Sequence, residues 1–372
     1  MKKIISVLVA IVMIVPFTQI RADAAVSGIS AVSAVVIEAE TGTVLYSKNM
    51  DEQRAMASTT KIMTAILTIE AGDLDREFTV DSYAIMVEGT SMGLREGDRV
   101  SRRDLLYGIL LPSGNDAANA AAVSVSGSMS AFVKKMNAKA ATLGLKNTHF
   151  ATPSGLDADG HYTTAYDLAM LAAYAMKNSI FREVVSCQYK EVEFGNPPYK
   201  RTLYNSNKML KQYEGAIGIK TGFTDNARRC LVSAAQRDGV ELIAVTLNAP
   251  DDWNDHKKML DYGFTQVSAY DADTSCSAKV SVAGTGKTVG VYADKATISL
   301  TSSQRQRLER RILLPRIVYN DVQKGDKLGS IEFVLDGKTV KSVSLYAADS
   351  IESEKSGLSL WSRFLRFFGI YV

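Results

Sequence analysis

A serine and a lysine stand three residues apart in the stretch MASTTKIMTA, residues Met56–Ala65. Side chains at this spacing share one face of a helix, so the Lys61 amine can reach the Ser58 hydroxyl. A serine hydroxyl is a weak nucleophile unless a neighbouring base takes its proton, and a neutral lysine amine is such a base. A simpler interpretation makes Ser58 the N-cap of the helix and Lys61 an exposed charge. The stretch by itself leaves both interpretations open.

Two further motifs follow in order. Ser113-Gly114-Asn115 comes directly after Pro112, which ends a predicted helix, so its side chains lie in a loop that can line a cleft. Lys220-Thr221-Gly222 lies at the end of an apolar strand. Each motif alone occurs often by chance, whereas the ordered set of three is specific.

The three histidines are widely spaced and match no metal-binding or Ser–His motif. We therefore expect no metal and no other cofactor. Asp157, His161 and Asp167 have the residue types of acids and bases, but we favour helix capping and loop pinning as their role. Asp116 is expected to cap the helix that follows Asn115.

The N-terminus has the layout of a secretory signal peptide. Lys2 and Lys3 precede the apolar run Ile4–Phe17, and Ala22-Asp23-Ala24 offers a cleavage site. The run is too short to be a comfortable membrane span. We therefore expect residues 1–24 to be removed and the protein to be exported.

The chain that remains is almost neutral. Three of the 43 Lys and Arg residues and one of the 40 Asp and Glu residues lie before residue 25, which leaves 40 basic and 39 acidic side chains. This balance gives no reason to expect nucleic acid binding. The cysteines are Cys187, Cys230 and Cys276; their number and spacing favour three core residues, with one disulfide as the alternative.

The elements around the three motifs predict an α+β domain over residues 25–266. A strand pair, Val35–Ala39 and Val44–Tyr46, precedes a helix from Ser58 to Gly72. A helical block follows, with helices over Arg103–Leu111, Ala117–Val125 and Thr164–Met176. Later come strands over Ala216–Ile219, Cys230–Ala235 and Glu241–Leu247, the last two joined by Asp238-Gly239, and a helix over Trp253–Tyr262 that ends at Gly263. This order predicts an antiparallel sheet with helices packed against both faces.

Residues 267–348 show short strand patterns separated by turn residues and predict a small, sandwich-like all-β domain. The stretch GTGKT, Gly284–Thr288, resembles part of a phosphate-binding loop. The full pattern needs a glycine where Ser281 stands, and no helix pattern follows, so we expect an ordinary loop.

The last segment, residues 349–372, begins with acidic and polar residues that suggest a linker and ends in GLSLWSRFLRFFGIYV. The helical pattern of this end has a broad aromatic face and a narrow polar stripe with Arg363 and Arg366. Such a helix is suited to lie in a membrane surface. The alternative is a tail that packs on its own domain.

From about Val35 onward the chain resembles the serine-type D-Ala-D-Ala carboxypeptidases, the low-molecular-mass penicillin-binding proteins. The resemblance is carried by the three motifs and by four further stretches: GTSMGLREGD, NTHF, PSGLDADGHYTTAYDLA and KKMLDYGF. It implies a catalytic domain with the β-lactamase/transpeptidase fold, the β-domain and an amphipathic membrane anchor.

The resemblance also implies roles for the motif residues. Ser58, Lys61 and Ser113 are implied to be catalytic, with Lys61 freed of its proton by burial and by Lys220. Asn115, Lys220, Thr221, Gly222 and Phe223 are implied to bind the substrate, a peptidoglycan stem pentapeptide ending in D-Ala-D-Ala. The backbone N–H groups of Ser58 and Phe223 are implied to form the oxyanion hole. β-Lactams are expected to acylate Ser58.

One stretch departs from the relatives. Many have Ala-Gly-aromatic where this chain has Ala227-Arg228-Arg229, and the two arginines either help to hold an anionic substrate or face solvent. A β-lactamase of the same fold is one alternative function, although no E-x-x-L-N stretch precedes Lys220. A non-catalytic cell-wall scaffolding protein is the other. The expected location is the outer face of the cytoplasmic membrane.

Overall fold

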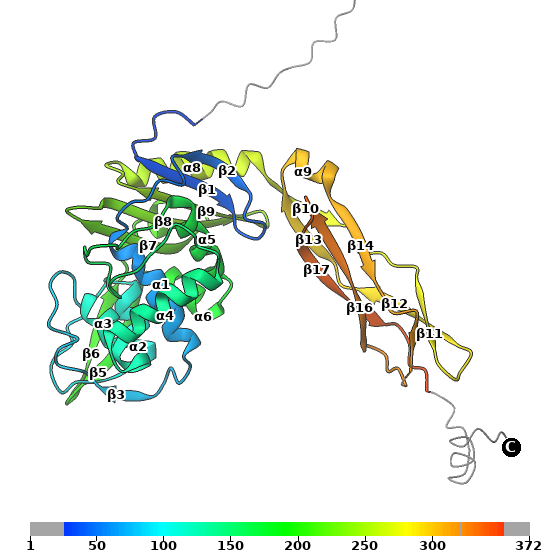
Figure 1. Ribbon diagram of the computed structural model, residues 1–372, viewed down its shortest axis with the longest axis horizontal. Coiled ribbons are helices and arrows are strands. Elements are labelled where there is room, and N and C mark those ends of the chain that lie inside the picture. Colours follow the sequence, from blue (N-terminus) through cyan, green and yellow to red (C-terminus); the bar gives the residue numbers. More distant parts are fainter. Residues whose placement is uncertain (1–25, 320, 353–372) are drawn as a thin grey trace, which may run out of the picture.

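The computed structural model describes residues 26–319 and 321–352. The predicted signal peptide and most of the predicted linker and amphipathic helix lie outside these residues. Figure 1 shows two folded parts, a larger one with a central sheet and helices and an elongated one built of strands. No helix in the described ranges is long and apolar enough to cross a membrane.

The larger part is organised by a five-stranded antiparallel sheet. In spatial order its strands are β2 (Val44–Lys48), β1 (Ser33–Glu38), β9 (Val240–Leu247), β8 (Arg228–Arg237) and β7 (Ala216–Thr224). Side chains alternate between the faces of a strand. In β1, Val35 and Ile37 belong to the core cluster shared with the helical block, whereas Ala34 and Val36 belong to the cluster on the other face.

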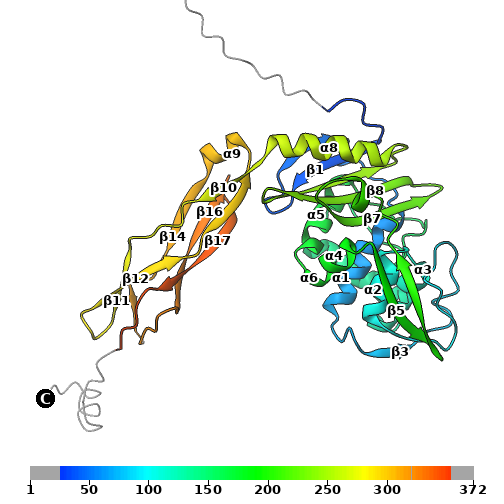
Figure 2. The same cartoon turned by 180° about the vertical axis from the view of Figure 1, so that it is seen from behind.

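Helices cover both faces of this sheet. Helix α8 (Asp252–Gln266) lies along one face and the helical block lies against the other (Figure 2). The other helices of this part are η1 (Ala57–Thr60, a 3₁₀ turn), α1 (Lys61–Glu70), α2 (Arg102–Leu110), α3 (Asn115–Ser126), α4 (Met129–Thr142), α5 (Ala165–Met176), α6 (Ser179–Ser186) and α7 (Met209–Gln212). Two hairpin-like pairs complete it: β3 (Glu77–Thr79) with β4 (Arg99–Ser101), and β5 (Tyr189–Gly195) with β6 (Pro198–Tyr204).

The predicted end of the last helix at Gly263 is wrong. Helix α8 continues to Gln266. A Cβ atom at Gly263 would lie 2.8 Å from Leu242 Cδ1 and 3.2 Å from Val36 Cγ1. This glycine therefore allows the helix to pack closely on the sheet, a role that sequence alone does not distinguish from a C-cap.

The elongated part contains two sheets. One pairs β10 (Ser268–Ala272) with β13 (Ala296–Leu300), and the other has the order β14 (Glu309–Leu313), β16 (Lys327–Leu335), β17 (Lys338–Ala347), β12 (Thr288–Ala293), β11 (Lys279–Val282) and β15 (Ile317–Val318). The short helix α9 (Ser302–Arg307) follows β13. The GTGKT stretch joins the antiparallel strands β11 and β12 with no helix after it, as expected for a loop.

Three polar contacts between described residues join the parts. In one of them Ser299 Oγ donates to the Gly239 carbonyl at 3.4 Å. Gln304 Nε2 donates to Thr43 Oγ1 at 2.7 Å, and Lys341 Nζ pairs with Glu40 Oε1 at 2.5 Å. Thr43 and Glu40 belong to the turn between β1 and β2, and Gly239 belongs to the turn between β8 and β9, so the elongated part contacts the end of the central sheet where these two turns lie.

Candidate active site

The three motifs meet around one pocket of about 490 Å³. Six of the eight predicted site residues line it: Ser58, Ser113, Asn115, Thr221, Gly222 and Phe223. The other two, Lys61 and Lys220, are 0% and 1% exposed and lie behind these lining residues. The pocket therefore joins a helix start, a loop and a sheet edge that are far apart in the sequence.

Ser58 lies in the 3₁₀ turn η1 and Lys61 is the first residue of α1. Neither helix has a side-chain N-cap, and Lys61 is fully buried, so the interpretation of an N-cap serine and an exposed lysine is wrong. Lys61 Nζ lies 2.8 Å from Ser58 Oγ, 2.7 Å from Asn115 Oδ1 and 2.7 Å from the Ser154 carbonyl oxygen.

These three contacts can orient the Lys61 amine in its neutral form, which the surroundings favour. Burial, and after it repulsion from Lys220, holds the Lys61 pKa well below its usual value. A neutral amine has two hydrogens and one lone pair. The oxygens of Asn115 and Ser154 can only accept, so they take both hydrogens. The lone pair is left facing Ser58, whose hydroxyl then donates to it.

Lys220 lies on β7, the strand at one edge of the sheet. Burial lowers its pKa to about 7, and its Nζ donates to the Thr221 carbonyl at 3.0 Å. Near neutral pH this group is therefore divided between its charged and neutral forms, and its charged form repels a proton from Lys61.

Ser113 has a left-handed backbone conformation, with φ of +68°. A residue with a Cβ adopts this region at a cost, so the surrounding contacts must hold it. The Ser113 carbonyl accepts from Thr90 Oγ1 at 2.6 Å, and Asn115 N donates to the Thr90 carbonyl at 2.7 Å. Thr90 therefore holds the turn at Ser113 and at Asn115. These two hydrogen bonds keep the motif directed toward the pocket.

Asn115 is engaged more than the sequence suggested. Its side-chain oxygen accepts from Lys61, and its Nδ2 donates to the Glu88 carbonyl at 2.7 Å. One amide hydrogen remains for a ligand. Its position is therefore fixed by Lys61 and Glu88 before any substrate arrives.

The edge strand β7 passes close to Ser58. A Cβ atom at Gly222 would lie 3.2 Å from Ser58 N, from the Met56 carbonyl oxygen and from Ala57 Cβ. The absence of a side chain at Gly222 allows this approach. Phe223 follows with 59% exposure at the rim of the pocket. Because β7 has a neighbour on one side only, its other edge can pair with an extended peptide.

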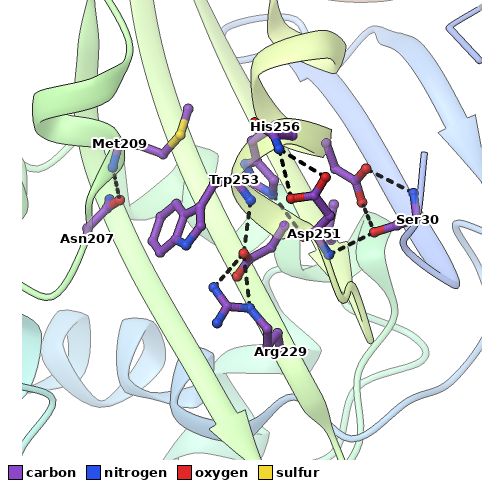
Figure 3. A network of polar contacts seen from close by, with 11 residues as sticks. Ser30, Asn207, Met209, Arg229, Asp251, Trp253 and His256 are labelled. Carbon is purple, nitrogen blue, oxygen red and sulfur yellow. Dashed lines mark hydrogen bonds and ion pairs between the residues drawn. The ribbon is translucent and has the colours of Figure 1, made fainter. Parts of the chain in front are cut away.

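The two arginines that depart from the relatives behave differently. Arg228 is exposed, with φ of +57°. Arg229 lines the pocket together with Trp253 at the start of α8, and it donates to Asp252 Oδ1 at 2.7 Å (Figure 3). The expectation that the arginines lie near the cleft therefore holds for Arg229, and Arg228 faces solvent.

The remaining polar candidates pin loops, as we favoured. His161 accepts from Ala151 N at 2.9 Å through Nδ1, and its Nε2 lies 2.8 Å from Thr60 Oγ1; burial lowers its pKa to about 4. The Asp167 carboxylate accepts from Asn147 N at 2.8 Å, and Asp157 accepts from Thr224 Oγ1 at 3.0 Å.

Asp116 is not the N-cap of α3, because that position is Gly114 and the helix has no side-chain cap hydrogen bond. It is the second residue of α3, and its carboxylate accepts from the backbone N–H groups of Met92, Gly93 and Leu94 at 2.9–3.1 Å. This carboxylate therefore holds the segment that borders the Ser113 turn. The prediction that Asp116 caps the helix was therefore wrong, because its carboxylate serves this neighbouring segment instead.

Two features of the site were absent from the sequence analysis. The Ser154 carbonyl is a backbone group, and only its place in the PSGLDADGHYTTAYDLA stretch draws attention to it. Asp252 and Trp253 reach the pocket from α8, about thirty residues beyond the last motif. The three cysteines are free in the structure, and Cys230 is buried.

Comparison with known proteins agrees with this architecture. Solved structures with the same arrangement include the Streptomyces K15 DD-transpeptidase, with a TM-score of 0.61 and 38% identity over 64% of this chain and 98% of that one. The D-alanyl-D-alanine carboxypeptidase DacD of Francisella tularensis has a TM-score of 0.62 and 26% identity over 88% of this chain and 95% of that one. The fold is thus the transpeptidase-like fold that the sequence predicted.

Comparison with family models and with named relatives agrees with the same architecture. The D-alanyl-D-alanine carboxypeptidase model matches residues 19–251, and the model of the penicillin-binding protein 5 C-terminal domain matches residues 264–353. D-alanyl-D-alanine carboxypeptidase DacF of Bacillus subtilis is 34% identical over 351 residues, 89% of this chain and 90% of that protein. DacC of Escherichia coli is 32% identical over 86% of this chain and 83% of that protein.

The chain belongs to the D-alanyl-D-alanine carboxypeptidase family. This membership confirms the resemblance drawn from the motifs. It favours the carboxypeptidase interpretation over a β-lactamase or a non-catalytic scaffold.

Proposed function

We propose that this protein is a serine D-Ala-D-Ala carboxypeptidase that removes the terminal D-Ala from peptidoglycan stem pentapeptides. The observation that carries the proposal is the contact between Lys61 Nζ and Ser58 Oγ, with both amine hydrogens committed to oxygens that only accept. This arrangement leaves the lone pair for the serine proton.

In the proposed reaction Ser58 Oγ attacks the carbonyl carbon of the penultimate D-Ala, and its proton passes to Lys61. The oxyanion is stabilised by the N–H groups of Ser58 and Phe223, donors of a kind whose loss typically costs on the order of 10²–10³ in rate. Ser113 relays a proton to the nitrogen of the leaving D-Ala. Water then hydrolyses the ester and frees Ser58.

Substrate binding is assigned to the remaining predicted residues. The peptide pairs with the free edge of β7 at Gly222 and Phe223. Lys220 and Thr221 face its terminal carboxylate, and Asn115 gives its free amide hydrogen to the peptide backbone. Arg229 adds positive charge at the pocket wall, although Asp252 offsets part of it.

The residues that line the pocket predict that the acyl-enzyme formed with a β-lactam is hydrolysed slowly. Among the residues that line it, Asp252 is the acidic one, and its carboxylate is paired with Arg229. The pocket has no glutamate among its lining residues to activate water. We therefore expect β-lactams to acylate Ser58 and to be released slowly.

Two assays test the function. Wild-type protein should bind fluorescent penicillin covalently and release D-alanine from diacetyl-Lys-D-Ala-D-Ala, and Ser58→Ala should do neither. Labelling that persists in Ser58→Ala would refute the assignment of the nucleophile. Rapid turnover of penicillin would favour a β-lactamase, and binding of cell-wall material without D-alanine release would favour a scaffold.

We also propose the division of the chain and its location. Residues 1–24 direct export, 25–266 carry catalysis, 267–348 form the β-domain, and 349–372 hold the enzyme on the outer face of the cytoplasmic membrane through an amphipathic helix. Family membership supports a cell-envelope location. Truncation after Ser356 should release the protein from membranes while D-alanine release continues, and unchanged membrane retention would contradict the anchor.

A further inference from the structure

The hairpin of β5 and β6 carries a largely buried arginine that the proposed reaction does not use. Arg201 on β6 leaves 12% of its side chain exposed. Its Cζ lies 3.8 Å from the ring centre of Phe194 and 3.8 Å from that of Tyr199, two residues that face each other across the hairpin. The guanidinium therefore stacks on two aromatic rings, a contact that favours arginine over lysine.

The hydrogen bonds of Arg201 offset only part of the cost of burying it. Its Nη1 donates to the carbonyls of Gly93 and Met92, at 2.8 and 3.5 Å. Its Nη2 lies 3.9 Å from Asp98 Oδ2, and neither Nη2 nor Nε donates a hydrogen bond to any residue that the structure describes. A buried donor without an acceptor is costly. An apolar side chain would fill this place at lower cost, so the contact that requires a donor here is the one with the segment at Gly93.

The segment that Arg201 holds is also held from its other side. Asp116 on α3 accepts from the backbone N–H groups of Met92–Leu94. Gly93 therefore has its N–H bound to α3 and its carbonyl bound to the hairpin, in a conformation with φ of +86° that glycine adopts readily. A carboxylate and a guanidinium thus fix this segment between two elements of the larger part.

The same segment supports the Ser113 turn. Thr90, three residues before Gly93, donates its hydroxyl to the Ser113 carbonyl at 2.6 Å, and its own carbonyl accepts from Asn115 N at 2.7 Å. Ser113 has a left-handed backbone, so the direction of its side chain depends on contacts that hold this conformation. A shift at Gly93 is therefore passed along three residues to Thr90, and from there to the Ser113 hydroxyl.

We propose that Arg201 is a positioning residue that keeps the Ser113 hydroxyl in place for proton delivery to the leaving amine. The inference rests on the proposed function. In that reaction the scissile C–N bond breaks after the serine ester bond forms, and the proton that Ser58 gave to Lys61 reaches the amine nitrogen through Ser113. Arg201 is not among the residues that line the pocket, so it acts through the segment at Gly93 and not on the substrate.

The experiment compares two substrates that form the same acyl-enzyme. One is diacetyl-Lys-D-Ala-D-Ala, and the other is its thioester analogue, in which sulfur replaces the nitrogen of the terminal residue. An amine must take up a proton in order to leave, whereas a thiol with a pKa of about 8.5 can leave as the thiolate. A defect in proton delivery should therefore lower kcat/KM for the amide and spare the thioester.

Arg201→Met should lower kcat/KM for the amide about 10- to 100-fold, the effect of a displaced catalytic group, and should change the thioester value by less than about threefold. Lys200→Met is the matched control, because Lys200 precedes Arg201 on β6 and pairs with Glu191 on the opposite, exposed face. It should leave both values unchanged. Both rates are measured on the same sample, so any unfolded protein lowers them equally and leaves their ratio intact.

Two further variants test the route through Ser113. Ser113→Ala should show the same selective loss, and Arg201→Met added to it should lower the amide value no further, because both residues serve one step. Arg201→Lys keeps a donor for the Gly93 carbonyl but not the planar group that stacks on the rings. It should therefore lose less activity on the amide than Arg201→Met.

The positioning role and the proposed function fail in different ways. An equal loss on amide and thioester in Arg201→Met, no loss on either, or a further loss on the amide when Ser113→Ala is already present would overturn the role of Arg201 and leave the carboxypeptidase intact. No D-alanine release by the wild type would overturn the proposed function, and this inference with it.

Discussion

The two folded parts of the chain treat polar side chains in opposite ways. The larger part buries two lysines, Lys61 and Lys220, and the carboxylates of Glu38 and Asp116. In the described ranges of the elongated part, Ser299 and Gln304 are the buried polar residues, and its core cluster is apolar. The backbone of the larger part is also strained at its pocket, where Ser113 adopts a left-handed conformation.

This contrast shows which part of the fold contains features that reduce its stability. Buried charge and strained backbone reduce stability, so they persist where a function requires them. The elongated part follows the ordinary pattern of apolar interior and charged surface. Substitutions of the same type in the two parts should therefore have different consequences, and four pairs test this.

The largest difference should come from paired lysine substitutions. Lys61→Met removes the base and should reduce D-alanine release and penicillin acylation by about 10³- to 10⁴-fold, at the upper end for a general base. Lys341→Met, at an exposed ion pair between the parts, should change neither rate. Steady-state kinetics and stopped-flow acylation measure both, and a Lys61→Met enzyme within tenfold of wild type would remove the basis of the mechanism.

The second test uses pH and stability. The pKa of Lys220 is about 7 in the folded protein and near 10.5 when the chain is unfolded. Between these values the unfolded state binds more protons, so the free energy of unfolding should rise with pH from about 7 toward 10, by about 1.4 kcal/mol per pH unit from this group. Urea titrations across this range should show a shallower slope for Lys220→Met.

The matched control is Lys338→Met, an exposed lysine of β17. It should keep the wild-type slope. Identical slopes for wild type and Lys220→Met would mean that Lys220 is not desolvated in the folded state.

A smaller difference should separate two strand glycines. Gly222→Ala brings a methyl group within 3.2 Å of Ser58 N and should displace the proposed oxyanion donor, with a loss of about 10- to 100-fold in kcat. Gly290→Ala in β12 meets its nearest atom at 3.8 Å and should leave kcat unchanged. Penicillin acylation rates compare them directly, and equal rates would argue against the tight approach of β7 to Ser58.

The smallest difference concerns turn residues with positive φ. Arg228→Gly should stabilise the protein by about 0.5–1 kcal/mol, because glycine adopts φ of +57° without a Cβ clash. Asp336→Gly should gain less, since aspartate tolerates this region better and Asp336 also pairs with Arg307 at 2.8 Å. Thermal unfolding measures both, and a loss of stability in Arg228→Gly would show that the arginine makes contacts worth more than the strain.

Local patterns in the sequence anticipated much of this molecule. Apolar spacing predicted α1, α5 and the strands β7, β8 and β9, and Asp238-Gly239 marked the hairpin between β8 and β9. The chemistry of a serine, a lysine and a glycine-containing strand end indicated the pocket itself. These features are visible in sequence because hydrogen bonding within helices and turns depends on neighbours a few positions away.

Other features were decided by the tertiary structure alone. Gly263 continues a helix because the sheet lies beneath it, and Lys61 is buried because segments nearly one hundred residues away supply the Ser154 carbonyl. Asn119 Oδ1 is buried without a donor among the described residues, an outcome of packing that the sequence does not show. Contacts of this kind join atoms that no local pattern relates, and many are made by backbone groups that every residue carries, so only the packed chain selects them.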